Sequence, residues 1–572
     1  MFVRTATRRN KDGSAVRYLQ LVHNEWDPAT KSAKMRVLHN FGREDQLDRA
    51  AIDRLAGSLC RLLEPGRAVA LREPGLVYQG SAAFGGPWLL DQLWQRLGIG
   101  TILTARLGAT RRDALAERVL FALVANRALD PSSKLAAAHW VGRKAHIDGL
   151  PETSDDACYR AMDWLHQVKG PVEKEIFHQV ANLLNLEVDL LFFDTTSTYF
   201  ELGGEDEPVV RDERGLPVPD GQDGAADGGG EDVMRGFRAY GKSKDHRDDL
   251  PQVVIGMAVT RDGIPVRVWC WPGSTNDSAL IRQVKDDMRD WTLSRVIWVA
   301  DRGFTSAANR RYLRQGDHHY IIGEKLRSGS AEAQAALSRQ GRYQDVAANL
   351  KVKEVRISES ERFVICYNPE GAERDAGVRA RMLAQLAELI TGTDKLTKTK
   401  RAELRGVIST KPGLNRYLRV TPGGLLRTDA ARIKAEENLD GKYLLRCSDP
   451  ALNAEDIALG YKQLYEVERG WRDIKQVIDL RPVYHRKEER IRAHVILCWL
   501  ALLLIRITET AAGTTWNKIA DEMGLLTLGT FTGPAGTFRQ TAELTKTQRD
   551  ILAKLKIPHP KKIIEATPAA TP

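Results

Sequence analysis

The chain has 572 residues, of which 42% are hydrophobic and 28% are charged. This length is too great for one ordinary hydrophobic core, so we expect about two to four domains, and the composition excludes fibrous and largely disordered proteins. Lysine and arginine number 85 against 75 aspartate and glutamate residues, which gives a net charge of +10 and suits a polyanionic partner without requiring one.

The first part of the chain changes character near residue 45. Residues 1–45 contain short alternating stretches such as 17–22, separated by turn-forming residues such as Asp12-Gly13. This pattern predicts a small antiparallel sheet. Residues 46–182 carry apolar side chains at helical spacing instead, which predicts a helical region.

From residue 183 the pattern favours short buried strands. One is predicted to end at Asp194 and another at Asp301, with two strands joined by a turn at 261–263 and a helix over 279–290 between them. A further helix and strand follow Asp301. Three strands, a helix, a strand, a helix and a strand is the order of a ribonuclease-H-like α/β core, in which acidic residues at adjacent strand ends converge. We therefore place the first part of such a core at 183–323.

The second half of the chain is predicted to interrupt this core and then complete it. Residues 324–440 mix short strand patterns with a long polar helical stretch, which indicates an inserted, mixed, β-rich subdomain. Residues 441–512 are predicted to supply a strand and then a helical segment from about 454 to 480. Residues 513–572 form a C-terminal segment, and 557–572 are predicted to be a loose tail.

Three other features bear on the class of protein. The six cysteines are scattered, which predicts buried free thiols and a reducing, intracellular compartment. The apolar run 495–505 is shorter than the roughly 20 residues that a bilayer needs, so we predict a buried helix and no membrane partner. The Gly- and Asp-rich stretch 202–232 is predicted to be a flexible loop.

Asp194 and Asp301 point to metal-dependent chemistry. A carboxylate closing a buried strand is costly unless it lies in a cleft or is paired, and Gly303 permits a tight turn just after Asp301. For either aspartate alone, a helix cap or a strand-end turn is the simpler interpretation; two such sites in one sheet favour a metal site. Reactions at a phosphodiester need charge neutralised at the attacking and leaving oxygens, and Mg²⁺ prefers oxygen ligands for that purpose.

A third acidic residue lies in the helical segment near residue 468. Tyr461, Leu464, Glu468 and Lys475 are spaced by 3, 4 and 7 residues, which predicts that they share one helical face. The alternative is a solvated face on which Glu468 and Arg472 form an ordinary ion pair.

This segment resembles the Y-x2-R-x3-E-x6-K signature of IS4-type insertion-sequence transposases, with Tyr461, Glu468 and Lys475 in place. Leu464 stands where the family has arginine. The phosphate contact that this arginine usually makes in the family would have to come from Arg472 or Arg469. Further segments resemble the IS1634 branch of these elements; they are 193–200, 241–252, 272–277, 299–304 and 480–494.

The resemblance implies a DDE transposase, an enzyme that cuts DNA at the ends of its element and transfers the strands into target DNA. It implies a catalytic and metal-binding triad of Asp194, Asp301 and Glu468, with two Mg²⁺ (or Mn²⁺) ions. The long separation between Asp301 and Glu468 agrees with the β-rich insertion that these transposases carry at this place.

The resemblance also implies partners. We expect double-stranded DNA (terminal inverted repeats and target), a homodimer when assembled on DNA, and a cytoplasmic, nucleoid-associated location in a bacterium. Residues 46–182 are assigned to terminal-repeat recognition by analogy alone, and a solvated basic loop is an equal alternative for 241–252. The residues expected to contact DNA are Tyr461, Lys475, Arg472, Lys244, Arg247 and Arg302.

Two other functions remain open at this point. A catalytically inactive, DNA-binding descendant of a transposase would be expected to lose one of the three acidic residues, and all three are present. Another ribonuclease-H-like nuclease would need neither the long insertion nor the helical N-terminal region.

Overall fold

A computed structural model of the chain describes residues 1–11, 13–60, 76–108, 114–186, 189–212, 214–218, 233–291, 295–327, 329–358, 361–481, 483–533 and 536–568. The chain divides into two compact units. The first comprises Met1–Gly80, Thr530–Arg539 and Glu565–Pro572, and the second comprises Ser81–Gly529 and Gln540–Ile564.

The first unit contains a three-stranded sheet and the larger part of each strand of a second sheet. Strands β1 (Phe2–Arg9), β2 (Ala15–Asp27) and β3 (Ser32–Arg43) pair antiparallel in the order β1-β2-β3, as the alternation of their residues predicts. Helix α1 (Arg49–Cys60) follows. The second sheet has the order β20-β19-β18-β4, and its strands are β4 (Val77–Ala83), β18 (Thr527–Gly533), β19 (Gly536–Thr541) and β20 (Ile563–Pro568).

Strands β4 and β20 differ from the sequence-based expectation. The region 46–182 was expected to be helical, and 557–572 was expected to be a loose tail, yet each contributes an edge strand to this second sheet. Strand β4 pairs with β18, which comes from the far end of the chain, and a pairing partner so distant in sequence leaves no local pattern.

The second unit is built on a nine-stranded mixed sheet, so the chain is an α/β protein. The order is β12-β13-β14-β17-β11-β10-β5-β8-β9, with β5, β10 and β11 parallel to one another and β8 and β9 antiparallel. The strands are β5 (Leu190–Tyr199), β8 (Gln252–Val259), β9 (Pro265–Pro272), β10 (Ile297–Ala300), β11 (His319–Glu324), β12 (Gln344–Ala347), β13 (Leu350–Ser358), β14 (Glu361–Tyr367) and β17 (Lys442–Cys447).

The middle of this sheet has the predicted succession of elements. Strands β5, β8 and β9 are followed by helix α8 (Asp277–Asp287), strand β10, helix α9 (Ala307–Leu313) and strand β11. A hairpin of β6 (Val209–Arg211) and β7 (Val233–Arg235) lies between β5 and β8. Part of the predicted loop 202–232, namely residue 213 and residues 219–232, lies outside the described residues.

The sheet is covered on both faces, which explains its apolar strands. Phe192 and Val299 belong to one hydrophobic cluster, whereas their neighbours Phe193 and Trp298 belong to another. Because alternate residues of a strand point to opposite faces, both faces must be buried, and a strand buried on both faces is apolar throughout. Strand β8 is buried over its whole length for this reason.

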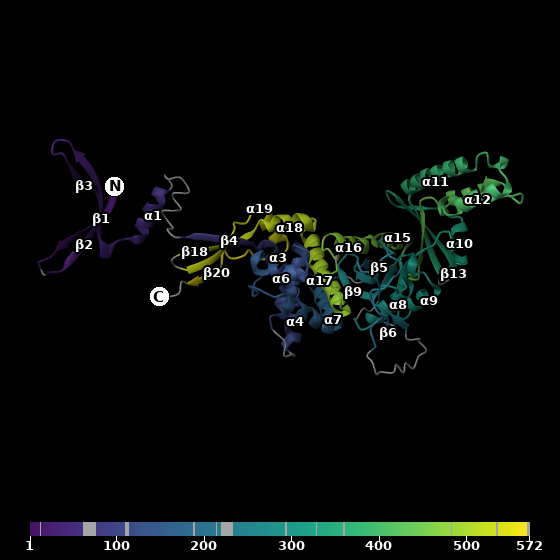
Figure 1. Ribbon diagram of the computed structural model, residues 1–572, viewed down its shortest axis with the longest axis horizontal. Coiled ribbons are helices and arrows are strands. Elements are labelled where there is room, and N and C mark those ends of the chain that lie inside the picture. The colour runs from purple at the N-terminus through teal and green to yellow at the C-terminus, as the bar shows by residue number, and fades with distance from the viewer. Residues whose placement is uncertain are drawn as a thin grey trace. The chain divides into compact units, whose positions relative to one another are not determined.

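The face that carries Phe192 is covered by helices. Helix α17 (Glu488–Ala512) contacts strand β9 and helices α5 (Ala116–Leu129) and α7 (Asp155–Leu184). Figure 1 shows α17 next to β9. By length and composition α17 could cross a bilayer, but 89% of its apolar window is buried inside the fold, as expected for a core helix. The surrounding helices are α3 (Gly85–Arg96), α4 (Ile99–Gly108), α5 (Ala116–Leu129), α6 (Lys134–Arg143), α7 (Asp155–Leu184), α18 (Trp516–Gly524) and α19 (Lys546–Lys554).

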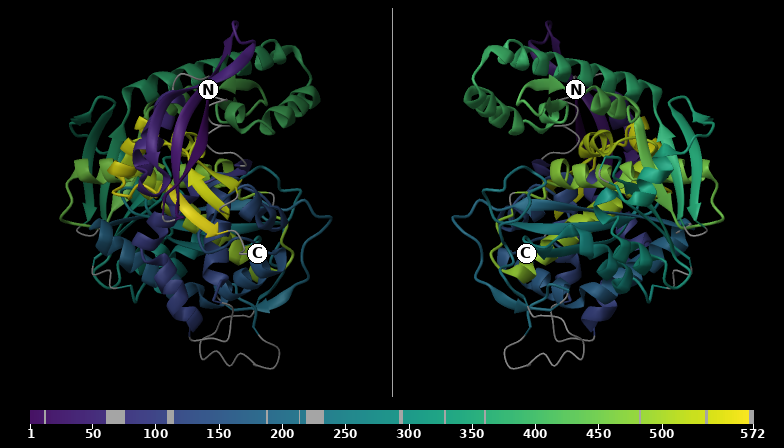
Figure 2. Two further views of the ribbon diagram at one scale, coloured as in Figure 1. Left: turned by 90° about the vertical axis from the view of Figure 1, so that its left-hand side faces the viewer. Right: turned by 90° about the vertical axis from the view of Figure 1, so that its right-hand side faces the viewer.

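Residues 324–440 contribute to two places. Strands β12–β14 extend the nine-stranded sheet beyond β17, with α10 (Ala331–Ser338) packed on them. The remaining elements enclose a small core of their own around Leu386 and Ile408, and Figure 2 shows its two long green helices side by side. These elements are α11 (Pro369–Ile390), α12 (Lys398–Ser409), α13 (Pro412–Asn415), β15 (Leu418–Val420), β16 (Leu426–Thr428) and α14 (Ala430–Glu437).

The described cysteine side chains are buried free thiols, as predicted; they are Cys158, Cys270, Cys366, Cys447 and Cys498.

Candidate active site

Asp194 and Asp301 are carried by neighbouring parallel strands. Phe193 of β5 is in register with Ala300 of β10, so each aspartate comes one residue later at the same level of the sheet. Asp194 lies inside β5, however, and not at its end as the sequence suggested. The strand continues because residues 195–198 are buried and pair with β8, and threonine is a good strand former.

The pKa of Asp194 is set by its burial and by the charges around it. Burial raises the pKa of Asp194 to about 6, against the opposing effects of Lys244 and of the Thr195 backbone N–H. The negative charges of Asp301 and Asp277 raise it further. A partly buried group of carboxylates with a raised pKa favours a bound cation, because a cation stabilises the ionised form.

Tyr461 holds the second aspartate. Its hydroxyl group donates a hydrogen bond to the carboxylate of Asp301, and burial together with this negative charge raises the pKa of Tyr461 above its ordinary value. Space for the phenol comes from Gly323 of β11, where an added Cβ atom would lie 2.5 Å from the Tyr461 hydroxyl oxygen. Glycine at 323 is therefore a condition for this contact.

The signature segment forms two helices, which corrects the prediction of a single helical face. Tyr461 lies in α15 (Ala454–Lys462), whereas Glu468 and Lys475 lie in α16 (Tyr465–Gln476). Between them, the backbone N–H of Leu464 donates to the carbonyl of Tyr461 at 3.0 Å, a three-residue step that tightens the chain. Leu464 is buried in the core, so its burial draws the turn inward.

Helix α16 packs tightly on the sheet. Val467, Trp471 and Ile474 form its buried stripe, and Gly470 allows close approach to β8, since an added Cβ would lie 2.6 Å from the Met257 methyl group. Glu468, next to this stripe, is exposed.

The three acidic residues are brought into one region without forming a closed set of ligands. The negative charge of Glu468 raises the pKa of Tyr461, whose hydroxyl group is hydrogen-bonded to Asp301. The negative charge of Asp301 raises the pKa of Asp194. Among the residues that the structure describes, no three His, Cys, Asp or Glu side chains form a group that could hold a metal ion as they stand. The structure therefore sets Asp194 and Asp301 on adjacent strands, and Glu468 is close enough to Tyr461 to affect the pKa of its hydroxyl group.

Several of the cations expected to contact DNA have partners within the protein. Lys475 pairs with Asp245 at 2.8 Å. Arg472 donates to the Tyr465 hydroxyl at 2.8 Å, which replaces the ion pair with Glu468 considered from the sequence.

Cations of the loop 241–252 also have partners within the protein. Arg247 pairs with Asp249 at 2.8 Å. Lys244 lies 3.8 Å from Asp194 and 3.1 Å from Asp277.

A basic cleft adjoins Asp301. It has a volume of about 500 Å³ and is bordered on one side by Tyr461 and Asp301. Four cationic side chains line it; they are Arg302, Lys325, Arg327 and Lys442. The carboxylates of Asp301 and Glu324 also line the cleft, and its excess of cationic side chains can accept a phosphate backbone.

Sequence reasoning missed Asp277 and Asp245. The segment around Asp277 was interpreted only as a helix start, and Asn276 does cap α8. The Asp277 carboxylate also accepts a hydrogen bond from the Thr195 hydroxyl at 3.0 Å, which brings it to the site. The only signal in the sequence that could have identified Asp277 as a site residue was its place in the motif 272–277.

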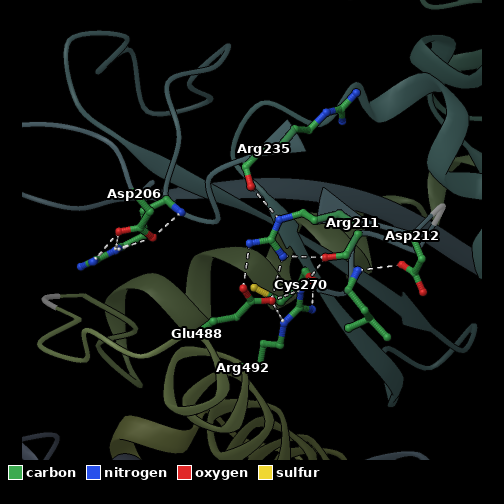
Figure 3. A network of polar contacts seen from close by, with 10 residues as sticks. Asp206, Arg211, Asp212, Arg235, Cys270, Glu488 and Arg492 are labelled. Carbon is green, nitrogen blue, oxygen red and sulfur yellow. Dashed lines mark hydrogen bonds and ion pairs between the residues drawn. The ribbon is translucent and has the colours of Figure 1, made fainter. Parts of the chain in front are cut away.

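A buried ion network anchors the β6–β7 hairpin. Figure 3 shows the guanidinium groups of Arg211 and Arg492 both turned toward the carboxylate of Glu488, with N–O distances of 2.9 and 2.7 Å. Arg492 also donates to the carbonyl of Cys270 in β9. The network joins the hairpin after β5 to the start of α17.

Comparison with known proteins identifies the family. The family model described as the transposase DDE domain matches residues 212–504, about half of the chain and a span that contains Asp301 and Glu468. The model described as the IS1634 family transposase N-terminal domain matches residues 3–67. The chain belongs to the IS1634 family of DDE transposases.

Two further comparisons concern single proteins. A cryo-EM structure of a piggyBac transposase synaptic complex with hairpin DNA is similar to this transposase, with 12% sequence identity and a TM-score of 0.34 over 79% of this chain and 81% of that chain. No curated protein sequence matches the transposase.

Family membership makes the protein a DDE-type enzyme, and transposases of this type act on DNA and generally use divalent metal ions. The residues present fit such ions. Asp194 and Asp301 offer hard oxygen ligands from adjacent strands. Burial, and to a smaller extent the charges of Asp301 and Asp277, raise the pKa of Asp194, and a bound cation would offset both effects by stabilising the ionised carboxylate.

Proposed function

We propose that this transposase cleaves DNA at the ends of its element and joins the freed ends to target DNA, with Asp194, Asp301 and Glu468 as the catalytic residues. The observation that carries the proposal is the register of β5 and β10, which sets Asp194 beside Asp301 with the Tyr461 hydroxyl bonded to the latter. The succession from β5 to β11 supports a ribonuclease-H-like core around them.

The three carboxylates would hold two Mg²⁺ or Mn²⁺ ions. Bound there, the ions neutralise charge at the attacking and leaving oxygens of the phosphodiester. The chain's own contribution is positioning. Tyr461 orients the Asp301 carboxylate through its hydroxyl group. The packing of α16 on β8 fixes the position of the backbone that carries Glu468. Glu468 would complete the ligand set when DNA and metal ions are bound.

The DNA strand would run along the basic cleft beside Asp301. Arg302 lines this cleft, and Tyr461 borders it. Arg472 is exposed on α16, whereas the Lys475 side chain is only 17% exposed in its pair with Asp245. Both would exchange their present internal partners for phosphate oxygens when DNA binds. Because two element ends must be joined together, we propose a homodimer assembled on terminal inverted repeats and target DNA.

Strand cleavage by purified protein tests the proposal. The substrate is duplex DNA carrying the repeats that flank the element, with Mg²⁺ or Mn²⁺, and Asp301→Asn and Glu468→Gln are assayed beside the wild type. We expect the wild type to cut and join, and both variants to bind DNA while cutting at least about 100-fold more slowly, since each loses a charged ligand.

The outcomes separate the remaining alternatives. Variants that cut as fast as the wild type would show that Asp301 and Glu468 are not catalytic. A wild type that binds its repeats and never cuts would favour the inactive DNA-binding descendant instead.

A further inference from the structure

Lys244 lies against the acidic residues. Its ammonium nitrogen is 3.8 Å from Asp194 Oδ1 and 3.1 Å from Asp277 Oδ2. It also donates hydrogen bonds of 2.6 Å to the carbonyl and the hydroxyl oxygens of Thr195. Four oxygen atoms, two of them from carboxylates, therefore surround a single cationic nitrogen.

The position of this ammonium group is set by the loop that carries it. The backbone N–H of Lys244 donates to Ser197 Oγ of β5 at 2.9 Å. The next residue, Asp245, pairs with Lys475 of α16 at 2.8 Å and with Arg481 at 3.3 Å. The loop is thus tied both to the strand of the first aspartate and to the helix of the catalytic glutamate.

The carboxylates of Asp194 and Asp277, which both lie within 4 Å of the Lys244 ammonium group, need a positive charge close by. The side chains of Asp194 and Asp277 are only 23% and 35% exposed, so water screens their mutual repulsion poorly. An ammonium group and a divalent cation both seek carboxylate oxygens, and two cations a few ångströms apart repel each other strongly in such a site. Binding of a divalent cation next to Lys244 in its present position is therefore opposed by the electrostatic repulsion between the two positive charges.

We propose that Lys244 is the resident counter-ion of the acidic site and competes there with the divalent cation. The inference rests on the proposed metal site at Asp194 and Asp301. It gives Lys244 a role other than the DNA contact expected from the sequence. The ammonium group compensates the carboxylates while no divalent cation is bound, and it moves away from Asp194 when one binds.

Calorimetric titration of the full-length protein with Mn²⁺, without DNA, tests this competition. Lys244→Gln removes the charge, Lys242→Gln at an exposed position in the same loop is the matched control, and Asp301→Asn reports on the metal site itself. We expect K244Q to bind Mn²⁺ at least about tenfold more tightly than the wild type, because a positive charge near the ion is gone. We expect K242Q to bind as the wild type does and D301N to bind much more weakly.

The possible failures are distinguishable. If D301N is weakened while K244Q binds Mn²⁺ no more tightly than the wild type, the counter-ion role is wrong and the proposed metal site stands. If D301N binds as tightly as the wild type, the metal ion lies elsewhere and the proposed function loses its site.

A second measurement needs no variant and so does not depend on the folding of K244Q. Acetylation of the wild-type protein by acetic anhydride, followed by mass spectrometry, compares individual lysines with and without saturating Mn²⁺. We expect Mn²⁺ to speed the acetylation of Lys244 and to leave that of Lys242 unchanged. An unchanged or slower reaction at Lys244 would show that the ammonium group does not move, which would overturn the inference.

Discussion

At the acidic site, the register of β5 and β10 sets Asp194 and Asp301 side by side, two residues that the strand patterns before them also single out in the sequence. The contacts of Lys244 with Asp277, and of Lys475 with Asp245, join segments that are tens to hundreds of residues apart. Such pairs carry no local pattern, because both members look like ordinary surface charges in the sequence.

The hydroxyl group of Tyr461 positions Asp301 for the proposed cleavage reaction. Tyr461→Phe removes the hydrogen bond to Asp301 and little else, since Gly323 still accommodates the ring. A hydrogen bond to a charged group contributes about 1.5–3 kcal/mol, so we expect DNA cleavage to slow by roughly tenfold or more. Single-turnover cleavage measures the rate.

The phenylalanine variant should bind DNA and unfold thermally as the wild type does, because neither the ring nor its packing changes. Wild-type cleavage rates in the variant would show that the tyrosine does not position Asp301 for the reaction.

At the scale of elements, the signature segment shows where periodicity misleads. The spacing of Tyr461, Glu468 and Lys475 predicts one helical face, yet the chain turns at Leu464 and places them on two helices. The deciding force is burial of Leu464, a tertiary effect that overrides local helix preference. Strand β5 is similar: it runs past Asp194 because β8 pairs with it.

Helix α16 keeps its place partly through a buried arginine. Arg506 of α17 is 1% exposed and pairs with Asp473 of α16 at 2.7 Å and with Glu509 at 2.8 Å. Arg506→Met leaves two carboxylates without this cation, so we expect the free energy of unfolding to fall by about 3–5 kcal/mol. Urea denaturation followed by circular dichroism measures it.

Arg469→Met is the matched control, because Arg469 pairs with the same Glu509 at 2.7 Å but its side chain is 32% exposed. We expect a loss of about 1 kcal/mol or less for this variant. Equal losses for the two variants would argue that burial of Arg506 is not what ties α16 to α17.

At the scale of the whole molecule, local patterns predicted more of the catalytic sheet than of its surroundings. Strands β8 and β9, their turn with Gly263 at φ +74°, and helix α8 with its Asn276 cap follow from short-range rules. The continuation of the same sheet through β12–β14, inside the segment predicted to be an insertion, depends on pairing with β17. Pairings over such distances are set by the tertiary fold and leave no trace in local composition.

If Asp194, Asp301 and Glu468 gather around one pair of metal ions, as we propose, Fe²⁺ bound in the same place will mark all three positions in the chain. Fe²⁺ bound in place of Mg²⁺, with ascorbate and peroxide, generates hydroxyl radicals that cut the backbone close to the ion, and mass spectrometry locates the cuts. We predict cuts near residues 194, 301 and 468 that excess Mg²⁺ suppresses and that Asp301→Asn removes. Cuts confined to other segments, or cuts near 194 and 301 that persist unchanged in Asp301→Asn, would contradict the account.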